Sequence, residues 1–369
     1  MTFSRISRRH LLQGTGAAAL ATTLPGRAAF AKDTTVGFIY VGSRDDYGYN
    51  QAHAVGAAAV KKMAGVKVVE EEKVPETEAV EKTMESMINL DGATLLFPTS
   101  FGYFNPHVLK VAKKYGKIRL EHCGGLWTEK DPTNVGSYFG YIDEAQYVAG
   151  IVAGHSTKTG KLGFVAAKPI PQLLRNVNAF ILGARLANPN ATLQVIFTGD
   201  WSMPVKEAEA TNSLIDAGVD VITCHVDGPK TVMENAARRG AMVSSYHVNA
   251  TNLAPQAHLT GAEWNWEVLY PRFVEMALKG QPIPNFYRGG LKEGLVKVAP
   301  YGPKVSEAAR KQADDVKAKL TAGSYVIFKG PIKDNKGNTV IGAGVARGQT
   351  DGELETMNYL VEGVIGATS

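Results

Sequence analysis

The stretch that decides the fold is residues 161–199, which read KLGFVAAKPIPQLLRNVNAFILGARLANPNATLQVIFTG. An apolar run over 161–167 is followed by an amphipathic pattern over 172–186 and by a second apolar run over 192–199. Short continuous apolar runs predict buried strands, and the amphipathic pattern between them predicts a helix. The order strand, helix, strand indicates a parallel sheet with helices on both faces.

The same rhythm continues on both sides of this stretch. Upstream, strands are predicted at 35–41, 66–71, 93–99 and 117–123, with helices over 50–63, 76–89 and 105–115. Downstream, helices are predicted over 205–217 and 230–239, with strands at 219–226 and 241–248. Residues 134–154 separate the two series, so the chain is predicted to form two α/β units. Ligands of such sheets bind at the carboxyl ends of the strands, and two facing units place those ends around one cleft.

The composition is that of an ordinary globular protein with room for two cores, since 369 residues are 44% hydrophobic and 20% charged. The formal charge of +5 comes mostly from residues 1–31, which hold four arginines and no acid. The remainder carries 36 basic residues against 35 acidic ones. No long run of lysine or arginine follows, so nucleic acid is not an expected partner.

The first 31 residues have the pattern of a secretory signal peptide. The adjacent Arg8 and Arg9 precede a modest apolar stretch, and the segment ends in Ala29-Phe30-Ala31. This order is typical of a twin-arginine leader, and we expect cleavage after Ala31 and a periplasmic protein. The alternative is an amphipathic first helix of the fold. The apolar stretch is too short and too interrupted to span a membrane.

Unusual residues gather in the loops that follow the predicted strands. Aromatic side chains with a few amides and charges suit a flat ligand with polar edges, because its faces stack and its edges hydrogen-bond. The candidates from these loops are Tyr47, Tyr49, Asn50, Phe101, Tyr103, Arg175, Trp201 and Asp227. Each also has a structural interpretation. A turn tyrosine can simply cover its neighbours, Arg175 can be a surface cation or an inter-lobe salt bridge, and Asp227 fits an ordinary turn.

Four motifs carry a resemblance to a known family: DDYGYNQAHAVGA, FPTSFGY, YIDEAQYVAGIVAGHSTKTGKLGFV and GDWSMPVKEAEATNSLIDAGVDVI. They are similar to motifs of the BMP (basic membrane protein) family of ABC-transporter substrate-binding proteins, whose characterised members include purine nucleoside receptors. The resemblance covers nearly the whole chain after the leader. It implies the two-lobed α/β fold of type I periplasmic binding proteins, in which each lobe is a parallel sheet sandwiched by helices. It also implies a purine ligand.

The resemblance implies roles for particular residues. Asn50 would hydrogen-bond a purine edge, while Tyr49 or Tyr47 on one lobe and Trp201 on the other would sandwich the ring. Glu144 would accept from an exocyclic amine or a ring N–H. As an alternative, Glu144 is a first-turn acid that stabilises its helix through the helix dipole.

The stretch HLTGAEWNWEVLYPRF bears on which purine compound binds. In nucleoside-binding relatives, an aspartate after the ninth strand and a lysine near the next helix hold the ribose hydroxyls. Here the aspartate position falls at Tyr246, His247 or Asn249, and the lysine position falls at Trp264 to Trp266. A tryptophan in the ribose space favours a free base, such as adenine or another purine, over a nucleoside. Residues two apart do not share a helix face, so at most one of the two tryptophans need face the cleft; alternatively both are core residues.

No pattern in the chain indicates catalysis or metal binding. The strand ends hold no GxSxG or HExxH motif, and the paired acids of the turn Arg44–Asp46 are typical of solvated or capping residues. The histidines form no close pair, and the only cysteines, Cys123 and Cys224, are predicted to be buried thiols. We therefore expect no catalytic residue, metal or cofactor, and a nucleoside- or base-processing hydrolase is the less favoured alternative. A transcription regulator of the same fold would need an N-terminal helix-turn-helix where this chain has a leader.

The predicted mechanism is hinge closure around a small ligand, after which a membrane permease recognises the closed form. Lobe one is assigned to 32–141 plus 250–285 and lobe two to 142–249 plus 286–369, with crossovers near Tyr141, Asn249 and Asn285. After Tyr325 the sequence predicts a hairpin around DNKGNT and a C-terminal helix, both structural.

Overall fold

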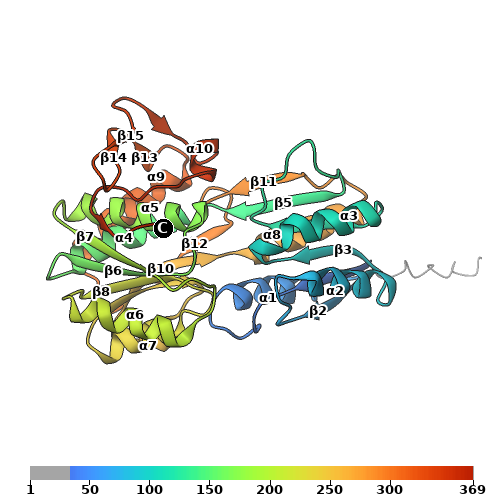
Figure 1. Cartoon of the computed structure of the whole chain (residues 1–369), viewed down its shortest axis with the longest axis horizontal. Coiled ribbons are helices and arrows are strands. Elements are labelled where there is room, and N and C mark those ends of the chain that lie inside the picture. The colour runs from blue at the N-terminus through green and yellow to red at the C-terminus, as the bar shows by residue number, and fades with distance from the viewer. Residues whose placement is uncertain (1–33, 369) are drawn as a thin grey trace, which may run out of the picture. The chain divides into compact units, whose positions relative to one another are not determined.

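The computed structural model describes residues 34–368, and its first large sheet has six strands in the order β11-β5-β4-β3-β1-β2 (Figure 1). All neighbours in this sheet are parallel, as predicted. The strands are β1 (Thr34–Ile39), β2 (Val66–Glu71), β3 (Ala93–Pro98), β4 (Arg119–Cys123), β5 (Val135–Gly140) and β11 (Phe286–Gly289). The predicted leader lies outside the described residues.

Helices cover both faces of the first sheet because successive strand residues point to opposite sides. Phe38 of β1 packs in one core and its neighbour Ile39 packs in another. The first core contains α1 (Tyr49–Val60) and α8 (Trp266–Leu278), and the second contains α2 (Glu78–Asn89) and α3 (Leu109–Lys114). We call this sheet with its helices lobe one.

The helix predicted over 105–115 is shorter than expected. The segment begins as a 3-10 turn, Phe101–Tyr103, and an irregular π-type turn, Phe104–Val108, and only then continues as α3. Asn105 has extended φ and ψ angles of −120° and 120°. It precedes Pro106, whose ring disfavours the helical conformation of the residue before it. The proline therefore delays the start of the regular helix.

The second large sheet has seven strands in the order β12-β10-β9-β8-β6-β7-β17. Its neighbours are parallel except for β10 and β12. The strands are β6 (Lys161–Ala166), β7 (Thr192–Phe197), β8 (Val221–His225), β9 (Met242–His247), β10 (His258–Trp264), β12 (Val296–Val298) and β17 (Val364–Ile365). One helical layer contains α4 (Asp143–Ser156), α5 (Pro171–Ala187) and α9 (Glu307–Thr321), and the other contains α6 (Pro204–Asp216) and α7 (Lys230–Arg238). We call this assembly lobe two.

The chain passes between the lobes at residues 141–142, at Asn265 and again after Gly289. The assignment of 250–285 to lobe one is therefore wrong at both ends. Residues 258–264 form β10, which pairs with β9 of lobe two, and residues 286–289 form β11, which pairs with β5 of lobe one. Only a 3-10 turn, Thr251–Leu253, separates β9 from β10, so the chain stays in lobe two until Asn265.

The tail forms small two-stranded pairs, β13 (Phe328–Lys329) with β16 (Ala346–Arg347) and β14 (Ile332–Lys333) with β15 (Thr339–Ile341). In the turn between β14 and β15, the Asp334 carboxylate accepts from the N–H groups of Lys336 and Asn338, so the predicted hairpin is present. The predicted terminal helix is only the single turn α10 (Gly352–Glu355). The chain then ends in β17, which adds a strand beside β7.

The helix pair α4 and α5 packs unusually closely, which explains the glycines of the AGIVAG motif. A Cβ atom on Gly150 would meet the carbonyl oxygen of Phe180, and one on Gly154 would meet that of Ala184. Gly183 of α5 likewise lies against the Tyr147 carbonyl of α4. Backbone atoms cannot move aside as a side chain can, so these positions require glycine.

We predict that Gly150→Ala lowers the free energy of unfolding by about 1–3 kcal/mol, as overpacking of a tight core does. Gly352→Ala is the matched control, because a Cβ at that helical glycine meets no atom within 4 Å. We expect the control to stay within about 0.5 kcal/mol of the wild type. Urea unfolding of the three ligand-free proteins measures both values. Equal stability of Gly150→Ala and the control would contradict the close-packing argument.

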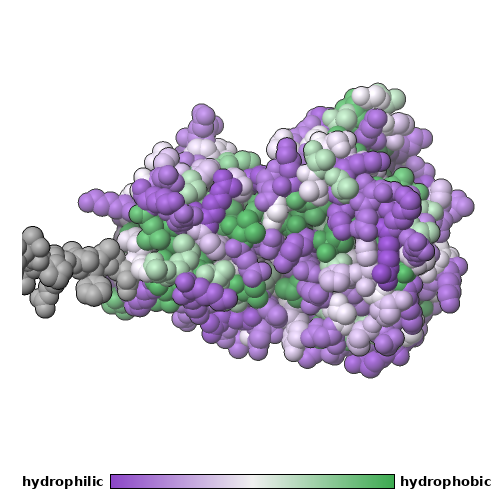
Figure 2. All heavy atoms as spheres, turned by 180° about the vertical axis from the view of Figure 1, so that it is seen from behind, coloured by the Kyte–Doolittle hydropathy of each residue, from purple (hydrophilic) through white to green (hydrophobic). Residues whose placement is uncertain are grey.

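The face in Figure 2 is mostly hydrophilic, with small apolar patches between polar side chains. Within residues 34–368, none of the helices combines the length and the apolar character that crossing a bilayer requires. Cys123 and Cys224 are both free and buried, as predicted.

Candidate functional site

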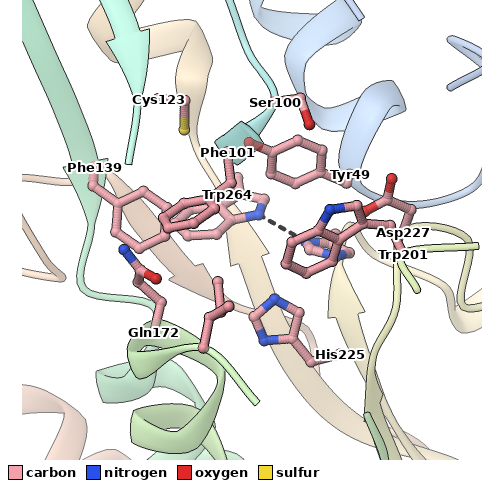
Figure 3. Close-up of a pocket in the computed structure, with 12 residues that line it drawn as sticks. Tyr49, Ser100, Phe101, Cys123, Phe139, Gln172, Trp201, His225, Asp227 and Trp264 are labelled. Atoms are coloured by element: carbon pink, nitrogen blue, oxygen red, sulfur yellow. Dashed lines mark hydrogen bonds between the residues drawn. The ribbon is translucent and has the colours of Figure 1, made fainter. Parts of the chain in front are cut away.

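A pocket lies between the lobes, at the carboxyl ends of their strands (Figure 3). In this arrangement of the lobes the cavity is small, with a volume of about 40 Å³. From lobe one it is lined by Tyr49, Ser100, Phe101, Cys123 and Phe139. From lobe two it is lined by Ile170, Gln172, Trp201, His225, Asp227, His247 and Trp264. Parallel strands collect their C-terminal residues at one edge of the sheet, which is why separate parts of the sequence meet here.

Six of the residues proposed from the sequence line this pocket: Tyr49, Phe101, Trp201, Asp227, His247 and Trp264. They come from five strand ends and the start of α1. Trp264 is the last residue of β10 and Trp266 is the first residue of α8, so Asn265 separates a strand from a helix. The two indoles stack, with centroids 4.8 Å apart and an interplanar angle of 16°. Only Trp264 reaches the pocket; Trp266 packs on His53 behind it.

Three further candidates from lobe one do not line the pocket. Tyr103 is fully buried and donates its hydroxyl hydrogen to the Val74 carbonyl. Asn50 is also buried, where it donates to the Asp46 carboxylate over 2.7 Å and accepts from the Gly42 N–H. Tyr47 lies beneath the ammonium group of Lys230, which is 4.8 Å from its ring centroid. The Tyr103 hydroxyl and the Asn50 amide are thus already used inside the protein, and none of the three residues lines the pocket in this structure.

Glu144 and Arg175 also lie outside the pocket wall. Glu144 accepts from the Leu291 N–H over 2.7 Å, just after the third crossover, and burial raises its pKa to about 7. Arg175 has its Nε atom 3.0 Å from the Asp143 carboxylate and donates to Gln349 of the tail. Glu144 is in the first turn of α4, which agrees with the alternative given for it. Glu144 thus joins α4 to the segment after β11, and Arg175 joins α5 to α4 and to the tail.

The sequence reasoning missed six residues of the wall: Ser100, Cys123, Phe139, Ile170, Gln172 and His225. Cys123 and Phe139 belong to strands β4 and β5, where an apolar residue cannot be distinguished from core by pattern alone. His225 is the last residue of β8, so its position at a strand end was a usable signal, and Gln172 is the second residue of α5, in the segment that follows β6.

His247 and Trp264 form a closed hydrogen-bonded pair in the pocket wall. The Trp264 Nε1–H donates to Nδ1 of His247 over 2.8 Å, and Nε2 of His247 lies 3.1 Å from the Val226 carbonyl. Nδ1 must accept in this arrangement, so Nε2 carries the proton and donates. Burial lowers the pKa of His247 well below its ordinary value. The imidazole is therefore neutral, and both of its nitrogens are occupied.

Asp227 connects the two lobes beside the pocket. Its backbone carbonyl accepts from the Tyr49 N–H over 2.8 Å, and its own N–H donates to the Trp201 carbonyl over 2.8 Å. Burial is the main reason why the pKa of its carboxyl is raised well above the ordinary value, and the nearby Asp46 and Glu76 raise it further. A protonated carboxyl can donate as well as accept, which suits it to a polar ligand edge.

Other polar atoms of the wall have unused hydrogen-bonding capacity. Gln172 donates to the Gly124 carbonyl of lobe one over 3.3 Å, while its buried Oε1 has no partner among the described residues. The buried Nε1–H of Trp201 likewise has none within residues 34–368. No cluster of three or more histidine, cysteine, aspartate or glutamate side chains in that range is arranged to hold a metal ion.

The fold and the pocket define a two-lobed binding protein of the type I periplasmic class. The solved structure of an ABC transporter solute-binding protein from Conexibacter woesei DSM 14684 superimposes with a TM-score of 0.65 at 20% identity, covering 79% of this chain and 97% of the other. This similarity confirms the predicted fold class.

The family model of PnrA-like ABC transporter substrate-binding proteins (Bmp) matches residues 33–336, and the chain belongs to this family. A purine-binding protein of Brucella abortus (strain 2308) is 33% identical over 350 residues, which are 94% of this chain and 97% of the relative. A Haloferax volcanii protein, named as a putative ABC transporter glucose-binding protein, is 29% identical over 353 residues, which are 96% of this chain and 86% of the relative. The chain is thus a substrate-binding component of an ABC transporter. Its family is one of binding proteins and not of enzymes. This role implies two partners, a small-molecule ligand and a permease.

Proposed function

We propose that this protein captures a free purine base in the periplasm and presents it to the permease of an ABC importer. The observation that carries the proposal is the position of Trp264. Its indole lines the pocket, and its N–H is bound to His247, one of the three residues at which the other position expected to contact ribose falls. A bulky, neutral pair thus stands where the resemblance leads us to expect a charged pair for the sugar hydroxyls.

The walls of the pocket support a flat ligand. Tyr49, Phe101 and Phe139 contribute aromatic rings from lobe one, and Trp201 and Trp264 contribute them from lobe two. Stacking of a nucleic-acid base on an aromatic side chain is worth about 1–3 kcal/mol. Polar groups with free capacity remain at Gln172, Trp201 and Asp227, and they can read the edge of a base.

The contacts between the lobes support a closing mechanism. The Tyr49 N–H bonds to the Asp227 carbonyl, and the Gln172 amide bonds to the Gly124 carbonyl, each joining one lobe to the other at the pocket rim. A ligand that touches both lobes adds its contacts only in the closed arrangement, so it shifts the population toward that arrangement. The permease then distinguishes the loaded form by its geometry.

The test is calorimetric titration of the mature protein, unfolded and refolded to remove any bound compound, with adenine, hypoxanthine, guanine, their nucleosides and glucose. We expect at least one base to bind about 100-fold more tightly than its nucleoside, a difference of about 2.7 kcal/mol. Equal or tighter binding of the nucleoside would favour the purine nucleoside receptor as the alternative. Binding of glucose without any purine would exclude the purine class.

A further inference from the structure

His225 has a feature that the proposed function does not use, namely an imidazole with one nitrogen held inside lobe two and the other facing the pocket. Nδ1 lies 2.9 Å from Nδ2 of Asn176, and the same Asn176 amide donates to the Tyr246 hydroxyl over 2.7 Å. An amide NH₂ can only donate, so Nδ1 of His225 must accept. The proton of the neutral ring is therefore on Nε2.

The orientation of the ring directs this proton into the pocket. In Figure 3 one ring nitrogen of His225 points between Trp264 and Trp201, and the other points away from the cavity. The nitrogen that points away is Nδ1, because its partner Asn176 is buried in α5. No hydrogen bond joins Nε2 to any of the described residues. Tyr246 packs on the ring with centroids 4.6 Å apart, which limits its rotation.

The charge state of the ring is also fixed. Burial lowers the pKa of His225 to about 3, so the ring stays neutral over the physiological range. A neutral ring with Nδ1 occupied has one available function, which is donation from Nε2. Gln172 Oε1 supplies an unpaired acceptor elsewhere in the same wall.

We propose that His225 is a specificity-determining residue, whose Nε2–H donates to an unprotonated ring nitrogen at the edge of the bound base. This inference rests on the proposed function and narrows it. The ligand must carry an in-plane acceptor opposite His225, and a base with C–H or N–H at that place is rejected. Asn176 and Tyr246 are positioning residues, because they hold the tautomer without touching the ligand.

The first experiment measures adenine and its 1-deaza, 3-deaza and 7-deaza analogues by calorimetry. With the wild type, we expect one analogue to bind about 10- to 100-fold more weakly than adenine, since it leaves a buried donor unsatisfied. With His225→Phe, which keeps an aromatic ring and removes the donor, that penalty should disappear. His225→Gln, which retains an N–H, should preserve it in part. His258→Phe is the control, because His258 is buried but does not line the pocket.

The second experiment observes the tautomer directly by ¹⁵N NMR of the histidine rings in ligand-free protein, with His225→Gln used to assign the signal. We expect a neutral ring protonated at Nε2, and protonation at Nδ1 would overturn the inference. If adenine and all three deaza analogues bind with equal affinity, the role given to His225 is overturned, while the proposed function remains intact. If no purine binds at all, the proposed function fails and the role given to His225 fails with it.

Discussion

Trp264→Ala is expected to reverse the preference of the pocket, so that the ratio of nucleoside affinity to base affinity rises by about 100-fold or more. Removing the indole opens space next to the bound base and frees His247 to meet a sugar hydroxyl. The base itself loses part of its stacking, at about 1–3 kcal/mol. Calorimetric titration with adenine and adenosine measures both changes.

Trp266→Ala is the matched control for this experiment. Trp264 and Trp266 stack on each other and are 5% and 1% exposed, but only Trp264 lines the pocket. Both truncations should destabilise the fold, by about 3–5 kcal/mol, as large-to-small core substitutions do. The affinity ratio is independent of the folded fraction, so it should change in Trp264→Ala alone. An equal change in the control would show that the preference is set by general packing and not by filling of the sugar space.

Arg119→Met is expected to cost up to about 1.4 kcal/mol more stability near pH 8 than near pH 5, because it removes the partner of a buried carboxylate, which is then driven to its protonated form. Glu121 is 0% exposed, and its Oε1 lies 2.6 Å from Nε of Arg119. The other oxygen, Oε2, has no partner among the described residues. The same guanidinium also bonds to the carbonyl groups of Ile283 and Pro284, which lie just before β11.

The pH dependence of this pair has a definite sign. Burial raises the pKa of Glu121 to about 7 against an ordinary value of 4.5, with Arg119 opposing the rise. The folded protein therefore holds more protons than the unfolded chain between these values, and stability falls as the pH rises through this window. Without Arg119 the pKa rises further. The cost of Arg119→Met should thus be small near pH 5, where Glu121 is protonated, and should grow toward about pH 8.

Urea unfolding of the ligand-free proteins at both pH values measures this difference. Glu121→Gln is the control that keeps the shape of the side chain and removes its charge. In that variant the contribution of residue 121 to the pH dependence should vanish. A loss in Arg119→Met of the same size at both pH values would mean that Arg119 acts through its carbonyl contacts and not through Glu121.

The sequence predicted the fold class and the family because the relevant signals are local. The runs that became β1, β3, β6 and β8 are mostly apolar, since helices cover both of their faces. The strand β10 was missed because HLTGAEW contains Thr260 and Glu263, which look solvated in a linear reading. All seven of its residues are buried, because β9 and β12 flank the strand within the sheet and helix α4 packs on it.

The site was only partly predictable for a related reason. Position at a strand end identified Trp201, and the family resemblance identified Trp264, as residues that line the pocket. Neither signal could show that the hydroxyl of Tyr103 ends on a backbone carbonyl or that the amide of Asn50 is used by Asp46. Val74 is 29 residues away from Tyr103 along the chain, and a backbone carbonyl has no sequence signature. Asp46 is only four residues from Asn50, but the sequence does not show that these two side chains bond to each other. Only the folded chain selects these partners. The ligand-binding role of each residue stays a prediction that the titrations will test.

The clustering of indoles gives the molecule a built-in optical reporter. Trp201 and Trp264 line the pocket, and Trp266 lies directly behind it, which leaves Trp127 as the one tryptophan of the four in the chain that is elsewhere. Most of the intrinsic fluorescence therefore originates where the ligand arrives. The stacked, nearly parallel Trp264 and Trp266 rings are also close enough for their electronic transitions to couple. Near-ultraviolet circular dichroism can thus follow the strand-to-helix junction at Asn265 without any added label.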